Sequence, residues 1–193
     1  MPNLVIILAS TRPGRAGLPI AEWFTERARD HPAFDVRLVD LAAVDLPLLD
    51  EPDHPRLRRY RHAHTKRWSA TIAAADAFVF VTAEYNHGYP APLKNAIDYL
   101  HEEWSYKPVG FVSYGGVAAG TRAVEQLQQV VCAVRMQPVI AQVNIPFHTQ
   151  FFDDEGRVQA NEIMEQAAVT MLDELVRVAA ALRPLRPALP QAA

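Results

Sequence analysis

Several short stretches of the chain are apolar without interruption, a pattern that predicts strands buried on both faces of a sheet. Residues 4–8 read Leu-Val-Ile-Ile-Leu, and residues 77–82 read Ala-Phe-Val-Phe-Val-Thr. Two more strands are expected at 108–114 and 137–145. At 35–41 apolar and polar residues alternate, which is typical of a half-exposed or edge strand. The pattern therefore predicts five strands.

Between these strands, apolar residues recur at helical spacing. Helices are expected at 18–29, 57–75, 93–100, 121–134 and 161–182. Strands that alternate with helices indicate βαβ units with right-handed crossovers. The expected fold is therefore α/β: a three-layer sandwich with a parallel sheet between helices. Residues 1–183 are expected to form one domain, and the proline-rich residues 184–193 a disordered tail.

Composition narrows the class of protein. Half of the 193 residues are apolar and 21% are charged, which is an ordinary globular mixture. A formal net charge of −3 gives no electrostatic case for binding nucleic acid. The single cysteine, Cys132, excludes an intramolecular disulfide, and its place in a predicted helix favours a small buried core residue. The apolar run 4–9 is too short for a signal or a membrane span, so we expect a cytoplasmic protein without a membrane partner.

Three loops follow the carboxyl ends of predicted strands, where ligands bind in open parallel sheets. They are residues 10–17, 83–92 and 113–120. Because the carboxyl ends of parallel strands share one edge of the sheet, the three loops are expected to converge. This edge is therefore the candidate binding site.

The first loop has the chemistry of a phosphate site. It offers the hydroxyls of Ser10 and Thr11, the guanidinium groups of Arg12 and Arg15, and a helix N-terminus. The alternative is a solvated turn whose arginines point outward. The loop matches neither Gly-x-Gly-x-x-Gly nor Gly-x₄-Gly-Lys-Ser/Thr.

The other two loops favour a flat ligand. Residues 84–92 read Glu-Tyr-Asn-His-Gly-Tyr-Pro-Ala-Pro, a stiff loop with a flat face that suits an aromatic heterocycle, unless its aromatics only cover the core. In the third loop, Gly115 and Gly120 have the spacing of a nucleotide-binding loop, but Thr121-Arg122 replaces the required lysine. NTP hydrolysis is therefore not expected, and the glycines instead allow the backbone to approach a flat ligand closely.

Together the three motifs resemble the NADPH-dependent FMN reductase family, flavodoxin-like reductases of quinones, azo compounds and metal ions. The resemblance covers residues 4–182, and its strongest part is Glu84-Tyr85-Asn86 followed by Leu93-Lys94-Asn95-Ala96-Ile97-Asp98. Ser10-Thr11-Arg12-x-x-Arg15 resembles the phosphate loop of the family, and Ser113-Tyr114-Gly115-Gly116 stands where the family has its glycine-rich third loop. Ala83 departs from the proline that many members have before Glu-Tyr-Asn.

The resemblance implies a five-stranded flavodoxin-like sheet of order 2-1-3-4-5, with FMN at the switch between the first and third strands. It implies that Ser10, Thr11, Arg12 and Arg15 hold the FMN phosphate. Ala83, Glu84, Tyr85 and Asn86 would border the flavin ring, and Ser113, Tyr114, Gly115 and Gly116 would pass along its other edge.

It also implies NADPH or NADH as electron donor and a small-molecule acceptor: a quinone, azo compound, metal oxyanion or free flavin. No side chain is needed as acid, base or nucleophile, so no catalytic residue is expected. Members are often homodimers or homotetramers, and residues 93–100 and 147–152 are our expected contacts between subunits.

Other functions remain as alternatives. A non-enzymatic FMN electron carrier of the flavodoxin type is usually shorter and markedly acidic, whereas this chain has six basic residues between 56 and 67. A flavin- or nucleotide-sensing module without turnover is a third possibility. His62 and His64 point to different faces of a predicted helix, so no metal site is expected. A hydrolase is not indicated, because no Gly-x-Ser-x-Gly elbow is present.

Overall fold

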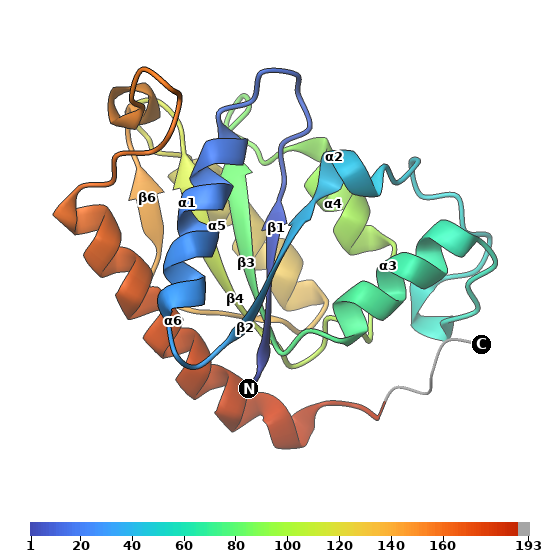
Figure 1. Cartoon of the computed structure of the whole chain (residues 1–193). Helices are drawn as coiled ribbons and strands as arrows, with labels where there is room; N and C mark the ends of the chain where they lie inside the picture. Colours follow the sequence, from blue (N-terminus) through green and yellow to red (C-terminus); the bar gives the residue numbers. More distant parts are fainter. Residues whose placement is uncertain (189–193) are drawn as a thin grey trace.

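A single parallel sheet runs through the middle of the computed structural model, which describes residues 1–188 (Figure 1). The strands are β1 (Asn3–Leu8), β2 (Asp35–Asp40), β3 (Ala77–Ala83), β4 (Pro108–Tyr114), β5 (Gln137–Pro138) and β6 (Val143–Ile145). Their order is β2-β1-β3-β4-β5, with β6 also paired to β4, and all pairs are parallel. The predicted order 2-1-3-4-5 is confirmed.

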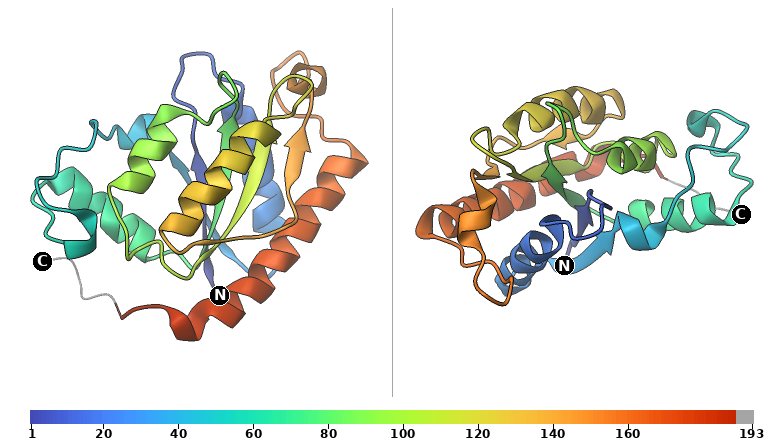
Figure 2. Two further views of the ribbon diagram at one scale, coloured as in Figure 1. Left: turned by 180° about the vertical axis from the view of Figure 1, so that it is seen from behind. Right: turned by 90° about the horizontal axis from the view of Figure 1, so that it is seen from above.

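Helices cover both faces of this sheet (Figure 2). They are α1 (Gly17–Asp30), α2 (Leu41–Val44), α3 (Ala63–Ala73), α4 (Ala91–Asp98), α5 (Thr121–Ala133) and α6 (Glu162–Leu182). Short 3-10 helices lie at Pro55–Leu57, His148–Phe151 and Arg183–Leu185. Within residues 1–188, no helix combines the length and the apolar character that crossing a membrane requires.

The core explains the continuous apolar run of β1. Leu4, Ile6 and Leu8 pack on the side of α1 and α6, whereas Val5 and Ile7 pack on the side of α3, α4 and α5. Successive side chains of a strand point to opposite faces, so a strand covered on both sides needs apolar residues at every position. The predicted three-layer arrangement is confirmed.

The expected strand at 137–145 is divided into β5 and β6. After Pro138 the chain leaves the ladder, and the N–H groups of Ile140 and Ala141 donate to the carboxylate of Glu174 at 3.1 and 2.8 Å. Val143 then rejoins β4 by pairing with Val112. A side chain of α6 thus replaces the strand partner of two backbone N–H groups.

The expected helix at 57–75 is wrong in its first third, since α3 begins only at Ala63. The cause is the fully buried carboxylate of Glu103. It accepts hydrogen bonds from Tyr60 Oη at 3.0 Å and Ser69 Oγ at 2.6 Å, and from Arg58 Nε at 3.2 Å. Burying a carboxylate requires several such donors, and Arg58 and Tyr60 are drawn out of helical geometry to supply them.

Two smaller expectations also differ from the structure. Cys132 is exposed on α5 rather than buried. The proline-rich end is placed as far as Arg186, which pairs with the Asp76 carboxylate and donates to the Asp76 carbonyl oxygen at 2.8 Å. Arg186 thus makes defined contacts in the segment where a disordered tail is expected, and residues 189–193 lie outside the described residues.

Lys107 is a buried cation at the amino end of β4. It is 4% exposed, and its Nζ donates to the carbonyl oxygens of Ile72 at 2.8 Å and Ala73 at 3.1 Å, in the last turn of α3. Burial, assisted by the positive charge of Arg186, lowers the pKa of the Lys107 ammonium to about 7.

We expect the free energy of unfolding to rise between about pH 7 and pH 9. In this window the unfolded chain keeps the Lys107 proton, with a pKa near 10.5, whereas the folded chain has lost it. The unfolded state then binds more protons, so a rising pH favours the folded state, by at most about 1.4 kcal/mol per pH unit. Urea unfolding across this range measures the slope. Lys107→Met should flatten it, and an unchanged slope in that variant would assign the rise to other groups.

Candidate functional site

Three loops meet above the carboxyl ends of the central strands, at the top of the sheet in Figure 1. They are residues 9–16 after β1, 84–90 after β3 and 115–120 after β4. The phenol of Tyr114 donates to Ser10 Oγ at 3.1 Å and thereby connects the end of β4 to the first loop. The N–H of Phe147, after β6, donates to the Gly116 carbonyl oxygen at 3.1 Å and adds a fourth segment. The loops converge as the sequence predicts.

The first loop presents donors that have no acceptor within the described residues. The N-cap of α1, Ala16, supplies no side-chain hydrogen bond, and the first turn contains no acidic residue. The Nε of Arg15 is buried without a partner. Ser10 is fully buried, and its Oγ accepts the Tyr114 hydrogen bond. A helix N-terminus beside unpaired donors and an arginine is a site for an anion.

The two arginines of this loop differ in their surroundings. The Arg15 guanidinium forms an ion pair with Asp40, the last residue of β2. Asp40 also accepts a hydrogen bond from the Ala42 N–H at 2.9 Å and so caps α2. Arg12 is exposed and has no ion-pair partner within residues 1–188. Arg15 is therefore held in place by the protein, whereas the charge of Arg12 is available to a ligand.

The second loop is a tight two-residue turn. Tyr85 and Gly88 exchange backbone hydrogen bonds of 2.8 and 2.9 Å, and both Asn86 and His87 have positive φ angles, 50° and 69°. These features define a type I′ turn. Tyr85 is 41% exposed on it. Ala83, the last residue of β3, is buried. The turn thus holds a tyrosine and an asparagine at the edge of the site.

Glu84 ties this turn to α5. Its carboxylate accepts a hydrogen bond from Arg122 Nε at 2.6 Å and forms an ion pair with the same guanidinium. Burial acts to raise the pKa of the Glu84 carboxyl, but the hydrogen bond and the charge of Arg122 outweigh it and lower the pKa below its ordinary value. Glu84 therefore stays ionised at neutral pH, with Oε1 on Arg122 and Oε2 buried without a hydrogen-bond partner in the described residues.

The third loop brings its backbone close to other groups. A Cβ at Gly120, where φ is +82°, would come within 3.0 Å of the Tyr114 carbonyl oxygen, so only glycine fits this position. The carbonyl oxygen of Gly115 is 3.0 Å from His148 Nδ1. Gly116 is exposed, with open space where a side chain would lie. The loop thus offers bare backbone to a ligand that approaches it.

Sequence reasoning missed two residues of this region. Asp40 and His148 are absent from the three motifs, although His148 lies within the expected contact 147–152. The His148 ring meets the Tyr114 ring edge-on, with centroids 5.3 Å apart. The sequence signal for Asp40 is its position at the end of an expected strand.

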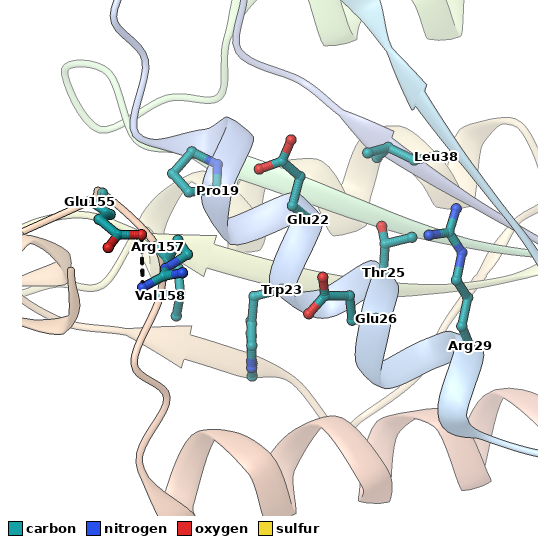
Figure 3. Close-up of a pocket in the computed structure, with 11 residues that line it drawn as sticks. Pro19, Glu22, Trp23, Thr25, Glu26, Arg29, Leu38, Glu155, Arg157 and Val158 are labelled. Carbon is teal, nitrogen blue, oxygen red and sulfur yellow. Dashed lines mark ion pairs between the residues drawn. The ribbon is translucent and has the colours of Figure 1, made fainter. Parts of the chain in front are cut away.

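Two grooves lie beside the edge strand β2 and share no residue with the three loops. One, of about 650 Å³, runs along the outer side of α1 (Figure 3). Glu22 and Glu26 line it, together with an ion pair between Glu155 and Arg157 at 2.9 Å. The other, of about 300 Å³, lies between β2 and α3 and is lined by basic and apolar side chains. Neither has the exposed backbone or the uncapped helix of the loop site.

Comparison with known proteins also indicates a flavin-dependent reductase. The family model described as NADPH-dependent FMN reductase matches residues 2–150. An NAD(P)H-dependent FMN reductase of Schizosaccharomyces pombe is 42% identical over 149 residues, which cover 75% of this chain and 74% of the relative. An FMN-dependent NADPH-azoreductase of Staphylococcus saprophyticus is 25% identical over 175 residues, covering 89% and 92%.

Among solved structures, the flavoenzyme NAD(P)H:(acceptor) oxidoreductase FerB of Paracoccus denitrificans superposes with a TM-score of 0.75. The match covers 94% of this chain and 98% of FerB, at 20% sequence identity. At this identity the likeness concerns the fold.

Proposed function

The chain belongs to the NADPH-dependent FMN reductase family, and on that premise we propose that it passes two electrons from NADPH or NADH through FMN to a small-molecule acceptor. The acceptor is a quinone, an azo compound, a metal oxyanion or free flavin. Relatives named as azoreductases and as quinone oxidoreductases support the azo compound and the quinone among these acceptors.

The observation that carries the proposal is the set of unpaired donors around the start of α1. The buried Nε of Arg15 has no partner and the first turn of α1 has no side-chain cap, and the buried Ser10 hydroxyl lies beside them. The phosphate of FMN offers several oxygens and a negative charge, so it fits this set. We assign Ser10, Thr11, Arg12 and Arg15 to the phosphate.

The two other loops would hold the flavin ring. On one side lie Ala83, Glu84, Tyr85 and Asn86, which the turn and the Glu84–Arg122 pair keep in a fixed position. On the other lie Ser113, Tyr114, Gly115 and Gly116. The Ser113 hydroxyl donates to Asn144 Oδ1 at 2.9 Å, and the exposed backbone of Gly116 allows close approach.

The role of the protein itself would be to bind FMN and to orient its ring. The positive charge of Arg12 would offset the charge of the phosphate, Arg15 would offer its unpaired Nε, and the rigid turn would set the plane against which a flat ring can lie. The redox chemistry, two-electron transfer from a nicotinamide to an acceptor, would be supplied by bound FMN. The proposal therefore requires no acid, base or nucleophile among the side chains.

A visible spectrum of the purified protein, followed by anaerobic addition of NADPH, tests the proposal. We expect flavin bands that bleach with NADPH and recover when a quinone is added. Bound flavin that stays oxidised with NADPH would favour an electron carrier of the flavodoxin type. A protein that takes up no flavin, even after incubation with FMN, would contradict the assignment of all three loops.

We further propose a homodimer or homotetramer whose subunits meet beside the loops. Large apolar side chains on this edge support it: Val117 is 78% exposed and Phe147 55%. The expected contact at 93–100 is less well supported, because Leu93, Ala96 and Ile97 are buried in the chain's own core. Sedimentation of the purified protein at the mass of one subunit would contradict this assembly.

A further inference from the structure

We propose that Tyr114 is a positioning residue for phosphate recognition, and that it acts through Ser10. By donating its phenolic hydrogen to Ser10 Oγ, Tyr114 leaves the serine hydrogen available to an oxygen of the FMN phosphate. The inference rests on the proposed function. It assigns the Tyr114 hydroxyl to the phosphate end of the site, whereas the rest of the segment 113–116 borders the flavin ring.

The contact joins two distant parts of the fold. Tyr114 ends β4 and Ser10 follows β1, 104 positions earlier in the sequence, with β3 lying between these two strands in the sheet. Both residues are buried, Tyr114 at 4% and Ser10 at 0% exposure. Water therefore does not compete for the bond, and the pair is part of the packed interior beneath the loops.

The direction of the hydrogen bond follows from acidity. A phenol is a stronger acid than an aliphatic hydroxyl, so in a pair of the two it is the better donor. Burial raises the pKa of the Tyr114 phenol to about 12, so it keeps its proton at neutral pH. Within the described residues, the Tyr114 phenol has Ser10 Oγ as its hydrogen-bond acceptor.

The hydrogen of Ser10 is then without an acceptor. Within residues 1–188 the Ser10 hydroxyl donates to no protein group. A buried donor without an acceptor is costly, which makes the site favourable for a ligand that supplies one. Because the Tyr114 bond fixes the direction of one lone pair, it also restricts where the serine hydrogen points.

Gly17 places this pair against the helix N-terminus. A Cβ at Gly17, the first residue of α1, would come within 2.6 Å of Ser10 Oγ and would also collide with the Tyr114 phenol oxygen. The two hydroxyls therefore lie directly beside the uncapped turn of α1, where the phosphate is proposed. On its other side, the Tyr114 ring is packed edge-on against His148.

Comparing FMN with riboflavin, which lacks the phosphate, tests this role. We would measure the affinities of full-length, flavin-free protein for both ligands by flavin fluorescence, in the wild type and in Tyr114→Phe. The variant should bind FMN about three- to tenfold more weakly and riboflavin unchanged. Ser10→Ala should give the same pattern, and adding Tyr114→Phe to it should have little further effect.

Controls separate this role from a structural one. Tyr99→Phe removes another buried tyrosine hydroxyl, which donates to Asp50 Oδ1 at 3.0 Å and to the Pro47 carbonyl oxygen at 3.1 Å, and it should leave the ratio of the two affinities unchanged. Equal losses for FMN and riboflavin in Tyr114→Phe would overturn the proposal, as would no loss for either. If the wild type showed no preference for FMN over riboflavin, the proposed phosphate site itself would be wrong.

Discussion

Replacing Arg12 by alanine is expected to weaken FMN binding by about 10- to 100-fold while the fold remains intact. A hydrogen bond to a charged group contributes about 1.5–3 kcal/mol, which corresponds to this range. Arg12 is exposed and has no ion-pair partner within the described residues, so its removal leaves no buried charge behind. Titration of flavin-free protein with FMN measures the loss, and thermal unfolding checks the fold.

The matched control is Arg59→Ala, which removes another exposed arginine, between the 3-10 helix Pro55–Leu57 and α3, outside the three loops. It should bind FMN as the wild type does. Riboflavin affinity should change little in either variant, because the lost contact is with the phosphate. Arg12→Ala protein that purifies fully yellow would contradict the assignment of Arg12.

Gly17→Ala should reduce FMN binding at least about 100-fold, because it displaces the phosphate loop. The added methyl would lie 2.6 Å from Ser10 Oγ and 2.9 Å from Leu8 Cδ1, closer than real contacts allow. The loop, the Tyr114 side chain or the start of α1 must move to accommodate it. Overpacking of this kind also lowers the free energy of unfolding by about 1–3 kcal/mol.

Gly88→Ala provides the comparison for this substitution. It adds the same methyl at the same edge of the sheet, but its nearest neighbour would be the Tyr85 carbonyl oxygen at 3.6 Å, an ordinary contact. We expect near wild-type stability and flavin content for Gly88→Ala. If Gly17→Ala matched it in both measurements, the close packing of Ser10 and Tyr114 on α1 would not be required for binding.

The order of the sheet could be predicted because the strands carry strong local patterns and a recognisable motif follows each central strand. The continuous run of β1 has to be apolar, since neighbouring positions face two different helical layers. The predictions of secondary structure that were wrong share one cause: a buried contact with a residue far away in the sequence. Glu103 rearranges residues 58–62 from more than 40 positions away, and Glu174 of α6 divides the last strand.

The site was predictable to the level of its loops but not of its side-chain pairs. Hydroxyls, arginines and glycines after a strand indicate a phosphate loop, and the Glu-Tyr-Asn segment indicates a ring loop. That Arg15 would pair with Asp40, and Glu84 with Arg122, depends on how β2 and α5 pack beside those loops. The connection of Tyr114 to Ser10 likewise requires the three-dimensional order of β1, β3 and β4.

Charged side chains on the edge strand β2 oppose aggregation through that edge. Two copies joined there as antiparallel strands centred on Arg37 would set Arg37 of one directly opposite Arg37 of the other, and like charges directly opposite are destabilising. Arg67 lines the same groove as Arg37, between β2 and α3, and adds a second positive charge on that side of the strand. Growth of the sheet from one molecule to the next is thus opposed by charge along a strand that pairs with β1 alone in the described residues.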